Sequence, residues 1–225
     1  MSKLLYNTDA HRQHRYWQTD NSHRPINHPV VSGFAQQRWR YINKLLPTKE
    51  IKRALDVGCG TGFSTYYAPE NIKFTACDFS INMLSRNPGQ RKVCSDIMHL
   101  PFSDNSFDLV ICWEVLHHLP DPYEALREMN RLARKWLILF EPNPLNIFQA
   151  LFAVIDREHR WVLRFSKSYV LAKLSQAGFL PVQYKKVGLI FPNKTPLAMY
   201  HLLKYLPFHI PFIGISHFII AKKGI

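Results

Sequence analysis

Three glycines occupy alternate positions within five residues, at Gly58, Gly60 and Gly62, with Cys59 between the first two. Glycine loses more conformational entropy on folding than any other residue, so three of them this close together need a reason. Without side chains in the way, the backbone N–H groups of such a turn can approach a ligand closely. Because the apolar run 54–57 precedes it, the pattern predicts a strand, a glycine turn and the start of a helix.

A strand that leads through a glycine turn into a helix is typical of sites that bind an adenosine group. The spacing Gly58-x-Gly60-x-Gly62 differs from the G-x-G-x-x-G spacing of dinucleotide-binding turns, so a pyrophosphate ligand is less well supported. Asp56 stands two residues before the first glycine, where a carboxylate can meet a cationic group. The stretch therefore favours a nucleoside ligand that carries an amino group.

Acidic residues also follow the next two predicted strands. Asp78 lies 20 residues after the first glycine, where a carboxylate can accept hydrogen bonds from both ribose hydroxyls. Asp96 ends the third strand and can accept from an adenine amino group, while Phe79 and Ile97 can hold the ring between them. One such carboxylate is often only a helix cap, but three at successive strand ends beside a glycine turn predict a nucleoside-cofactor site.

The elements that must position these residues alternate between strands and helices. Apolar runs predict strands at 53–57, 73–77, 92–95, 107–112, 136–140, 182–187 and 217–222. The run 107–112 is continuously apolar, as expected of a strand covered on both faces. The alternation predicts an α/β fold, with an open, mostly parallel sheet, helices on both faces and ligands at the carboxyl ends of the strands.

Capping residues place the helices between these strands. Ser80 and Ser166 are expected to be N-caps, and Asp121 is expected to cap a helix in a capping-box pattern with Glu124. A further helix is expected over about 33–46, before the first strand.

Three segments resemble the class I S-adenosylmethionine-dependent methyltransferases. They are ALDVGCGTG, ACDFS and SDIMHLPFSDNSFDLVICWEVLHHLPDP, and they follow one another in that family's order between residues 53 and 140. Within the family they resemble the group of ubiquinone and menaquinone C-methyltransferases, with a methyltransferase type 11 domain. The resemblance implies S-adenosyl-L-methionine as cofactor and a Rossmann-like, doubly wound, seven-stranded sheet in which only the last strand is antiparallel. The predicted strand 217–222 fits that last position.

The resemblance also implies roles for individual residues. The methionine part of the cofactor would lie on Asp56, Gly58, Gly60 and Gly62, with Cys59 in the same turn. The ribose would lie on Asp78, and the adenine near Phe79, Met83, Asp96 and Ile97. The sulfonium and the substrate mouth would lie beside Cys112, Trp113 and His117.

A methyltransferase must orient its acceptor and, for an O–H acceptor, remove a proton. His117 and His118 follow the fourth strand and are candidates for that base, although both can equally serve packing or structural hydrogen bonds. Glu141, after the fifth strand, would open onto the substrate mouth; capping of a helix that begins near Pro144 explains it as well. Glu114 can act as base, cofactor contact or surface residue.

No metal site is predicted from the sequence. The four cysteines, Cys59, Cys77, Cys94 and Cys112, are 17 or 18 residues apart, which indicates buried thiols near strand ends rather than a zinc site or disulfides. The remaining histidines show no companion ligands at a tight spacing.

The charge of the chain is unevenly distributed. The formal net charge is +13, with basic ends at 1–54 and 157–225 and a mildly acidic centre. After the site, an apolar segment is followed by Arg157, Arg160 and Arg164 beside Trp161 and Phe165. These features favour a hydrophobic, quinone-like or lipid-like acceptor that enters through an apolar lid, with peripheral contact to an anionic membrane. Ordinary packing of a substrate-binding region, with solvated arginines, remains the simpler alternative.

Two other functions fit the same features. The basic ends could bind RNA phosphates in a tRNA- or rRNA-modifying methyltransferase, but no RNA-binding module is recognisable and the ends are strongly apolar. A non-catalytic protein that only binds the cofactor would keep the same acidic residues.

The chain is expected to form a single methyltransferase domain over residues 1–225. Residues 1–50 would form an N-terminal helical cap, 51–141 the cofactor-binding core, and 142–225 a substrate-side lid with the last strands. The sequence contains no signal peptide and no long uninterrupted apolar stretch, so we expect a cytoplasmic protein, peripheral on the inner membrane face if it meets lipid.

Overall fold

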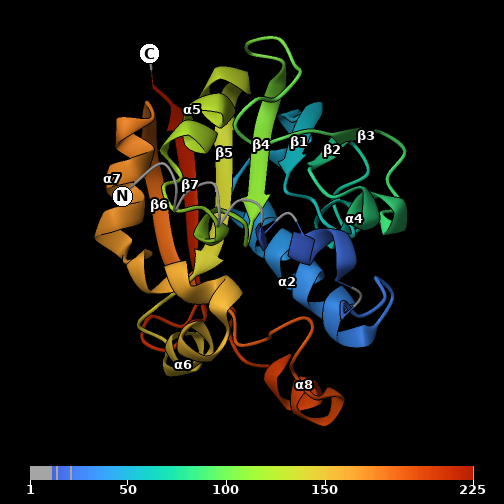
Figure 1. Ribbon diagram of the computed structural model, residues 1–225, viewed down its shortest axis with the longest axis vertical. Helices are drawn as coiled ribbons and strands as arrows, with labels where there is room; N and C mark the ends of the chain where they lie inside the picture. Colours follow the sequence, from blue (N-terminus) through green and yellow to red (C-terminus); the bar gives the residue numbers. More distant parts are fainter. Residues whose placement is uncertain (1–11, 14, 21, 225) are drawn as a thin grey trace.

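The computed structural model describes residues 12–13, 15–20 and 22–224, without the side chains of Arg157 and Glu158. Seven strands form one sheet (Figure 1). They are β1 (Arg53–Val57), β2 (Lys73–Asp78), β3 (Lys92–Cys94), β4 (Phe107–Trp113), β5 (Ala133–Pro142), β6 (Phe179–Val187) and β7 (Ser216–Lys223). Their order is β3-β2-β1-β4-β5-β7-β6, and only β7 runs antiparallel to its neighbours. The predicted fold class is confirmed.

Two strands are longer than their apolar runs. In β5, Glu141 and Pro142 pair with His217 and Ser216 of β7, so the ladder continues past the last apolar residue. Strand β6 begins at Phe179 because it pairs with the end of β7 there. Cross-strand pairing therefore extends both strands beyond what the composition alone indicates.

The helices lie between and beyond these strands. They are α2 (Pro29–Leu45), α3 (Phe63–Tyr66), α4 (Ile81–Arg86), α5 (Tyr123–Leu132), α6 (Ile147–Ile155), α7 (Lys167–Gln176) and α8 (Leu197–Leu203), with 3-10 turns η1 (Thr48–Glu50), η2 (Leu116–His118) and η3 (Arg157–Arg164). Residues 12–13 and 15–19 are also helical. Helices α6 and α8 lie at the carboxyl end of the parallel strands (Figure 1).

The expected caps are confirmed at two helices and wrong at a third. Ser80 accepts a hydrogen bond from the Met83 N–H at 3.2 Å, and Ser166 accepts one from the Tyr169 N–H at 3.3 Å. Asp121 is not the N-cap of α5. Its carboxylate accepts from the Tyr123 N–H at 3.0 Å, one position before the capping residue, and its other role is an ion pair with Lys173 at 2.9 Å.

Helix α2 begins four residues earlier than expected. His28 is its N-cap and accepts a hydrogen bond from the Val30 N–H through Nδ1 at 3.2 Å. Pro29 occupies the first helical position, where its missing N–H costs nothing. Histidine is not among the side chains that usually mark a helix start, so no capping residue could be recognised here before the structure was known.

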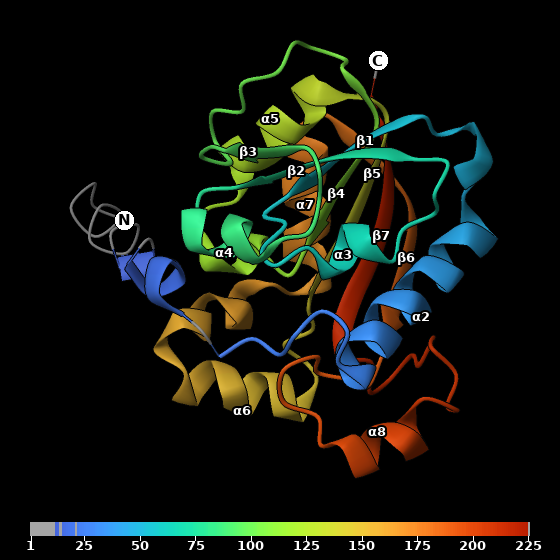
Figure 2. The same ribbon diagram turned by 90° about the vertical axis from the view of Figure 1, so that its right-hand side faces the viewer.

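Helices cover both faces of the sheet, as Figure 2 shows for α2 on one side and α5 and α7 on the other. Alternate residues of each strand supply the two cores, because side chains of a strand point to opposite faces. In β4, Val110 and Cys112 pack with α5 and α7, whereas Leu109 and Ile111 pack with α2. Three of the cysteines are buried as predicted; Cys94, at the end of the short edge strand β3, is exposed.

A buried arginine joins α2 to the end of the sheet. Arg38 is 1% exposed; it forms an ion pair with Glu114 and donates to the Ser216 hydroxyl at 3.1 Å. Its guanidinium lies 3.9 Å from the ring centre of Phe34 and 4.1 Å from that of Phe140. Burial lowers the pKa of Arg38 and the nearby Glu114 charge opposes that shift. The pair therefore fixes the N-terminal helix against the strand ends that carry the site.

Replacing Arg38→Met should destabilise the fold. Breaking a buried ion pair costs about 3–5 kcal/mol, and we expect the lower end of that range because the Glu114 side chain is 25% exposed. Urea unfolding of the purified protein measures the change. The control is Arg40→Met, an exposed position on the same helix, which should shift the unfolding free energy by less than about 0.5 kcal/mol. Equal stabilities for the two variants would contradict this role.

Candidate active site

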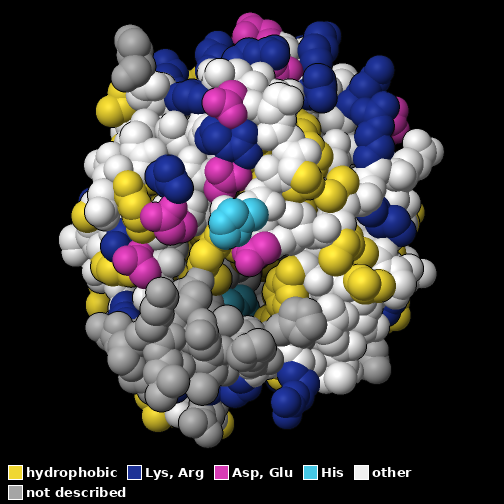
Figure 3. Space-filling model, turned by 45° about the horizontal axis from the view of Figure 1, so that its top comes forward, with side chains coloured by type: hydrophobic (Ala, Val, Ile, Leu, Met, Phe, Trp, Pro, Cys, Tyr) yellow, Lys and Arg dark blue, Asp and Glu magenta, His cyan; other side chains and the backbone are white. Residues whose placement is uncertain are grey.

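A cavity of about 680 Å³ opens at the carboxyl ends of β1, β2 and β4. Its walls come from far apart in the sequence: the N-terminal residues before α2, the glycine turn, the turn after β4, helix α6 and the segment 190–194. Figure 3 shows a hollow on this face, bordered by hydrophobic, acidic and histidine side chains. A site at this edge is what the parallel sheet predicts.

The glycine turn meets the cavity at two of its three glycines. Gly58 and Gly60 line the cavity with φ of 71° and 51°, and Cys59 lies between them. A Cβ atom at Gly60 would have no heavy atom within 4 Å, so this turn presents bare backbone to open space. Gly62 does not line the cavity. A Cβ there would come within 2.5 Å of Asn87, so its predicted ligand contact is replaced by a packing constraint.

Asp78 lies where it was predicted, at the end of β2 on the cavity wall. It is 8% exposed and accepts hydrogen bonds from the N–H groups of Gly60 and Ser80, each at 2.8 Å. Burial raises the pKa of Asp78, and these N–H donors oppose the shift. Phe79 and Met83 line the cavity next to it.

Asp56 does not reach the cavity, which corrects its predicted direct contact with a ligand. Its carboxylate is 1% exposed and accepts a hydrogen bond from the Ser64 hydroxyl, behind the glycine turn. Burial raises its pKa to about 7, opposed by the Ser64 hydrogen bond. Asp56 therefore links β1 to α3 through this hydrogen bond and stabilises the glycine turn between them.

The adenine-side residues lie on the cavity wall as predicted. Asp96 and Ile97 both line it, on the loop after β3. The Asp96 side chain is exposed and accepts from the Met98 N–H at 2.9 Å, which fixes the direction of the carboxylate. An exposed carboxylate at the cavity rim can accept a further hydrogen bond from a ligand.

At the end of β4, the side chains of Cys112 and Trp113 point to opposite faces of the sheet. Trp113 lines the cavity, and its buried Nε1 has no hydrogen-bond partner among the residues that the structure describes. Cys112 points into the core under α5 and is fully buried, so its predicted place beside the sulfonium is wrong for the side chain. Burial raises the pKa of the Cys112 thiol well above its usual range. Strand alternation explains the difference.

Glu141 is buried and does not open onto the cavity, contrary to the prediction. Its carboxylate accepts from three consecutive backbone N–H groups, at 3.1, 2.9 and 3.2 Å, in the turn of Val115, Leu116 and His117. It also contacts His117 Nδ1 at 2.9 Å. Helix α6 is capped by Asn146 instead, so neither predicted role of Glu141 holds; it positions the turn after β4.

Three histidines meet at the far side of the cavity. His117 and His118 belong to η2, and His159 comes from η3, some forty residues later. The ring centre of His159 lies 5.5 Å from that of His117 and 5.1 Å from that of His118. The His118 ring packs edge-on against Trp17, with 5.1 Å between the ring centres. Burial, and next the nearby His117, lower the pKa of His159 to about 4. The sequence offered no local pattern that pairs His159 with the other two.

Glu114 also lines the cavity, with a positive φ of 61° that is uncommon for a residue other than glycine. It is held there by Arg38 and by the Ser216 hydroxyl, which donates at 2.8 Å. Arg38 pairing lowers its pKa against the effect of burial. Glu114 is therefore an ionised carboxylate on the cavity wall and not simply a surface residue. Roles as a base or as a cofactor contact both fit this position.

The arginines after α6 do not line the cavity. Arg160 and Arg164 lie over the Trp161 ring, at 4.5 and 4.1 Å from its centre, and Phe165 is buried in the core. The side chain of Arg157 lies outside the described ones. Arg164 is exposed, whereas Arg160 is half-buried with its Nε enclosed.

The cavity fits a nucleoside with an amino-acid tail. Bare backbone at Gly60, a buried carboxylate at Asp78 and the unpartnered indole N–H of Trp113 are groups that such a ligand would satisfy. Aromatic and sulfur-containing side chains at Phe79 and Met83 give the apolar wall that a purine needs.

Comparisons with known proteins agree with this geometry. A family model described as a methyltransferase domain matches residues 55–138. Demethylmenaquinone methyltransferase of Staphylococcus aureus is 28% identical over 210 residues, which are 76% of this chain and 86% of that enzyme. An uncharacterised protein of Methanocaldococcus jannaschii is 40% identical over 110 residues, 47% of this chain and 48% of that protein, so the match spans about half of that relative.

The fold has solved counterparts. An S-adenosylmethionine-dependent methyltransferase of Thermotoga maritima superposes with a TM-score of 0.66 over 99% of this chain and 100% of that chain, at 18% identity. That likeness concerns the fold, and the methyltransferase domain match concerns the segments that carry the glycine turn and the acidic strand ends. Together these findings support a class I S-adenosylmethionine-dependent methyltransferase that uses S-adenosyl-L-methionine as its cofactor.

Proposed function

We propose that the chain transfers a methyl group to a hydrophobic, quinone-like or lipid-like acceptor that it draws from a membrane surface. The observation that carries this proposal is the position of α6. On its inner side Gln149 and Phe152 line the cavity, while on its outer side Phe148, Leu151 and Val154 are 67%, 56% and 71% exposed. One helix thus forms both a wall of the acceptor space and an apolar outer surface.

In this proposal the cofactor occupies the glycine-turn side of the cavity. Asp78 accepts from the ribose hydroxyls, Asp96 from the adenine amino group, and Phe79 and Ile97 contact the adenine ring. The backbone of Gly58 and Gly60 lies along the methionine part. S-adenosylmethionine, when bound, supplies an electrophilic methyl group on its sulfonium sulfur.

The histidine side of the cavity receives the acceptor. Trp113, His117 and His118 all line the cavity. A neutral imidazole nitrogen there can accept a hydrogen bond, and then a proton, from an acceptor hydroxyl. Glu141 acts through His117 and the turn, and is a positioning residue in this scheme.

An exposed apolar surface supports entry from a membrane. We define the lid surface as the exposed side chains of Leu145, Ile147, Phe148, Leu151, Val154, Ile155, Leu202, Tyr205, Phe212 and Ile213. Helices α6 and α8, which carry or adjoin them, lie at the same end of the molecule (Figures 1 and 2). Monomeric proteins rarely expose that many large apolar side chains at one end without a partner.

Basic residues contribute less to the proposed membrane contact than the sequence led us to expect. Lys204 lies beside Tyr205 of the lid surface in the sequence, but Lys and Arg also gather at the opposite end of the molecule (Figure 3). Among the described residues, no helix is both long and apolar enough to cross a bilayer. We therefore propose shallow insertion of the lid surface, in which burial of apolar side chains supplies most of the binding energy. The similarity to demethylmenaquinone methyltransferase supports an acceptor of this class.

Replacing Asp78→Ala should weaken S-adenosylhomocysteine binding. Hydrogen bonds to a charged acceptor contribute about 1.5–3 kcal/mol, so the dissociation constant should rise roughly 10- to 150-fold in isothermal titration calorimetry. Glu124→Ala, an exposed acidic position on α5, is the matched control and should bind as the wild type does. Unchanged affinity of the Asp78 variant would remove the ribose assignment.

The acceptor class can be read from the product. Total lipid, RNA and aqueous metabolite fractions are each incubated with the protein and a CD3-labelled cofactor, and mass spectrometry locates the label. We expect a CD3 group in place of hydrogen on a compound of the lipid fraction. Label in RNA would instead favour the tRNA- or rRNA-modifying alternative, and cofactor binding with no labelled product in any fraction would favour the non-catalytic one.

Vesicle binding tests the lid surface separately. The double variant Phe148→Asp, Leu151→Asp should bind anionic phospholipid vesicles at least roughly a hundredfold more weakly than the wild type in co-sedimentation, since each of the two apolar side chains contributes about 1.5–3 kcal/mol when buried. The control is Leu180→Asp, Val182→Asp on β6, which adds the same charge at exposed apolar positions away from the lid surface. Equal loss in both variants, or no binding by the wild type, would refute the membrane contact.

A further inference from the structure

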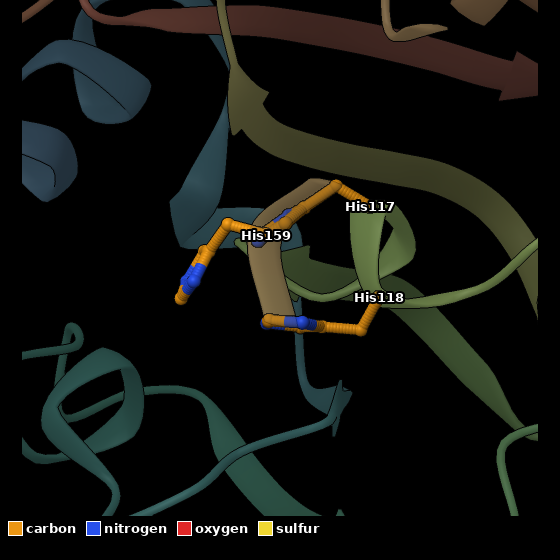
Figure 4. A group of neighbouring side chains, drawn as sticks. All are labelled: His117, His118 and His159. Carbon is orange, nitrogen blue, oxygen red and sulfur yellow. The ribbon is translucent and has the colours of Figure 1, made fainter. Parts of the chain in front are cut away.

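The three cavity histidines form a cluster with the dimensions of a metal site. One ring nitrogen from each of His117, His118 and His159 lies within 4.8 Å of the other two. Figure 4 shows His117 and His118 extending from η2 toward the segment that carries His159. Side chains from two separate elements thus place three metal-binding groups together on the cavity wall.

A carboxylate orients one of the three rings and lies near a second. Glu141 hydrogen-bonds to His117 Nδ1 at 2.9 Å, while Asp156 lies 3.2 Å from His159 Nδ1 without the alignment of a hydrogen bond. With its proton on Nδ1 toward Glu141, His117 keeps Nε2 as the electron-pair donor. This carboxylate–histidine arrangement is the usual second layer around protein-bound transition metals.

The cluster is also open on one side. All three histidines line the cavity, so ligands other than protein can approach a cation held between them. Three protein ligands with an open position are the pattern of catalytic zinc sites, whereas structural sites are closed by four. The donor set consists of imidazoles, which suit zinc, cobalt, nickel, copper and iron rather than magnesium or calcium.

We propose that His117, His118 and His159 bind one divalent transition-metal ion, with its open positions facing the acceptor side of the cavity. This proposal departs from the expectation that the chain has no metal site, which rested on the distances between histidines along the sequence. The binding itself is independent of the proposed function. Only its use rests on that function: the ion would polarise an oxygen donor of the acceptor, in place of direct proton removal by an imidazole.

The test uses the full chain, stripped of metal with a chelator and titrated with Co²⁺ in the absence of any acceptor. Visible absorption reports the coordination of Co²⁺, and elemental analysis gives the stoichiometry. We expect one tightly bound Co²⁺ per chain, with the d–d bands of a four- or five-coordinate site, displaced by Zn²⁺.

Variants separate the cluster from other histidines. His159→Ala and His118→Ala should each abolish the stoichiometric site, and Asp156→Asn should weaken it about 10- to 100-fold as the loss of a second-layer partner. His201→Ala, an exposed histidine on α8, is the matched control and should bind as the wild type does. Unfolding curves for each variant check that the chain still folds.

Two results would overturn the inference. One is the absence of stoichiometric Co²⁺ binding by a protein that still binds S-adenosylhomocysteine, which would leave the cluster as a proton-accepting group and the proposed function intact. The other is binding that survives in folded His159→Ala or is lost in His201→Ala, which would place the ion elsewhere. Metal uptake without cofactor binding would have the opposite meaning: it would support the site and contradict the cofactor placement.

Discussion

The active-site geometry depends on one buried carboxylate. Glu141 is fully enclosed at the end of β5, where an anion is stable only if its oxygens are fully hydrogen-bonded. It receives three backbone N–H groups and the His117 ring from the turn after β4. That requirement fixes the path of the turn, which in turn sets the direction of His117 and holds η2 against the cavity. The Arg38–Glu114 pair adds a second tie, from α2 to the same strand end.

Local pattern was sufficient for the sheet and for several of the residues that line the cavity. The glycine turn, Asp78 and Trp113 lie where adjacent sequence places them, because the end of a strand determines its neighbours. Asp56 and Cys112 were misassigned because strand alternation and burial, not position along the chain, decide which side chain faces the cavity. The roles of Arg38, Glu141 and His159 depend on partners tens of residues away, and no local spacing records such contacts.

The part of the chain after β5 lies between the cavity and the exposed lid surface. Helix α6 lies between the acceptor side of the cavity and the lid surface, and α8 packs close to α2, where a Cβ at Gly33 would lie 2.1 Å from the Tyr200 hydroxyl. Three parts of the molecule therefore border one cavity: the N-terminal region, the strand ends and the segment after β5. An acceptor that reaches the histidines through this opening would meet apolar and aromatic side chains such as Phe34, Phe152 and Ile190, together with polar ones such as Gln149 and Asn193.

We propose that the cofactor lies on the glycine turn with its sulfur directed at the turn that Glu141 holds. A crystal structure of the complex with S-adenosylhomocysteine would reveal this placement. We expect ribose hydroxyls on the Asp78 carboxylate, adenine between Phe79 and Ile97, and the thioether facing Trp113 and His117. Density for the ligand elsewhere, or with its sulfur turned away from η2, would contradict it.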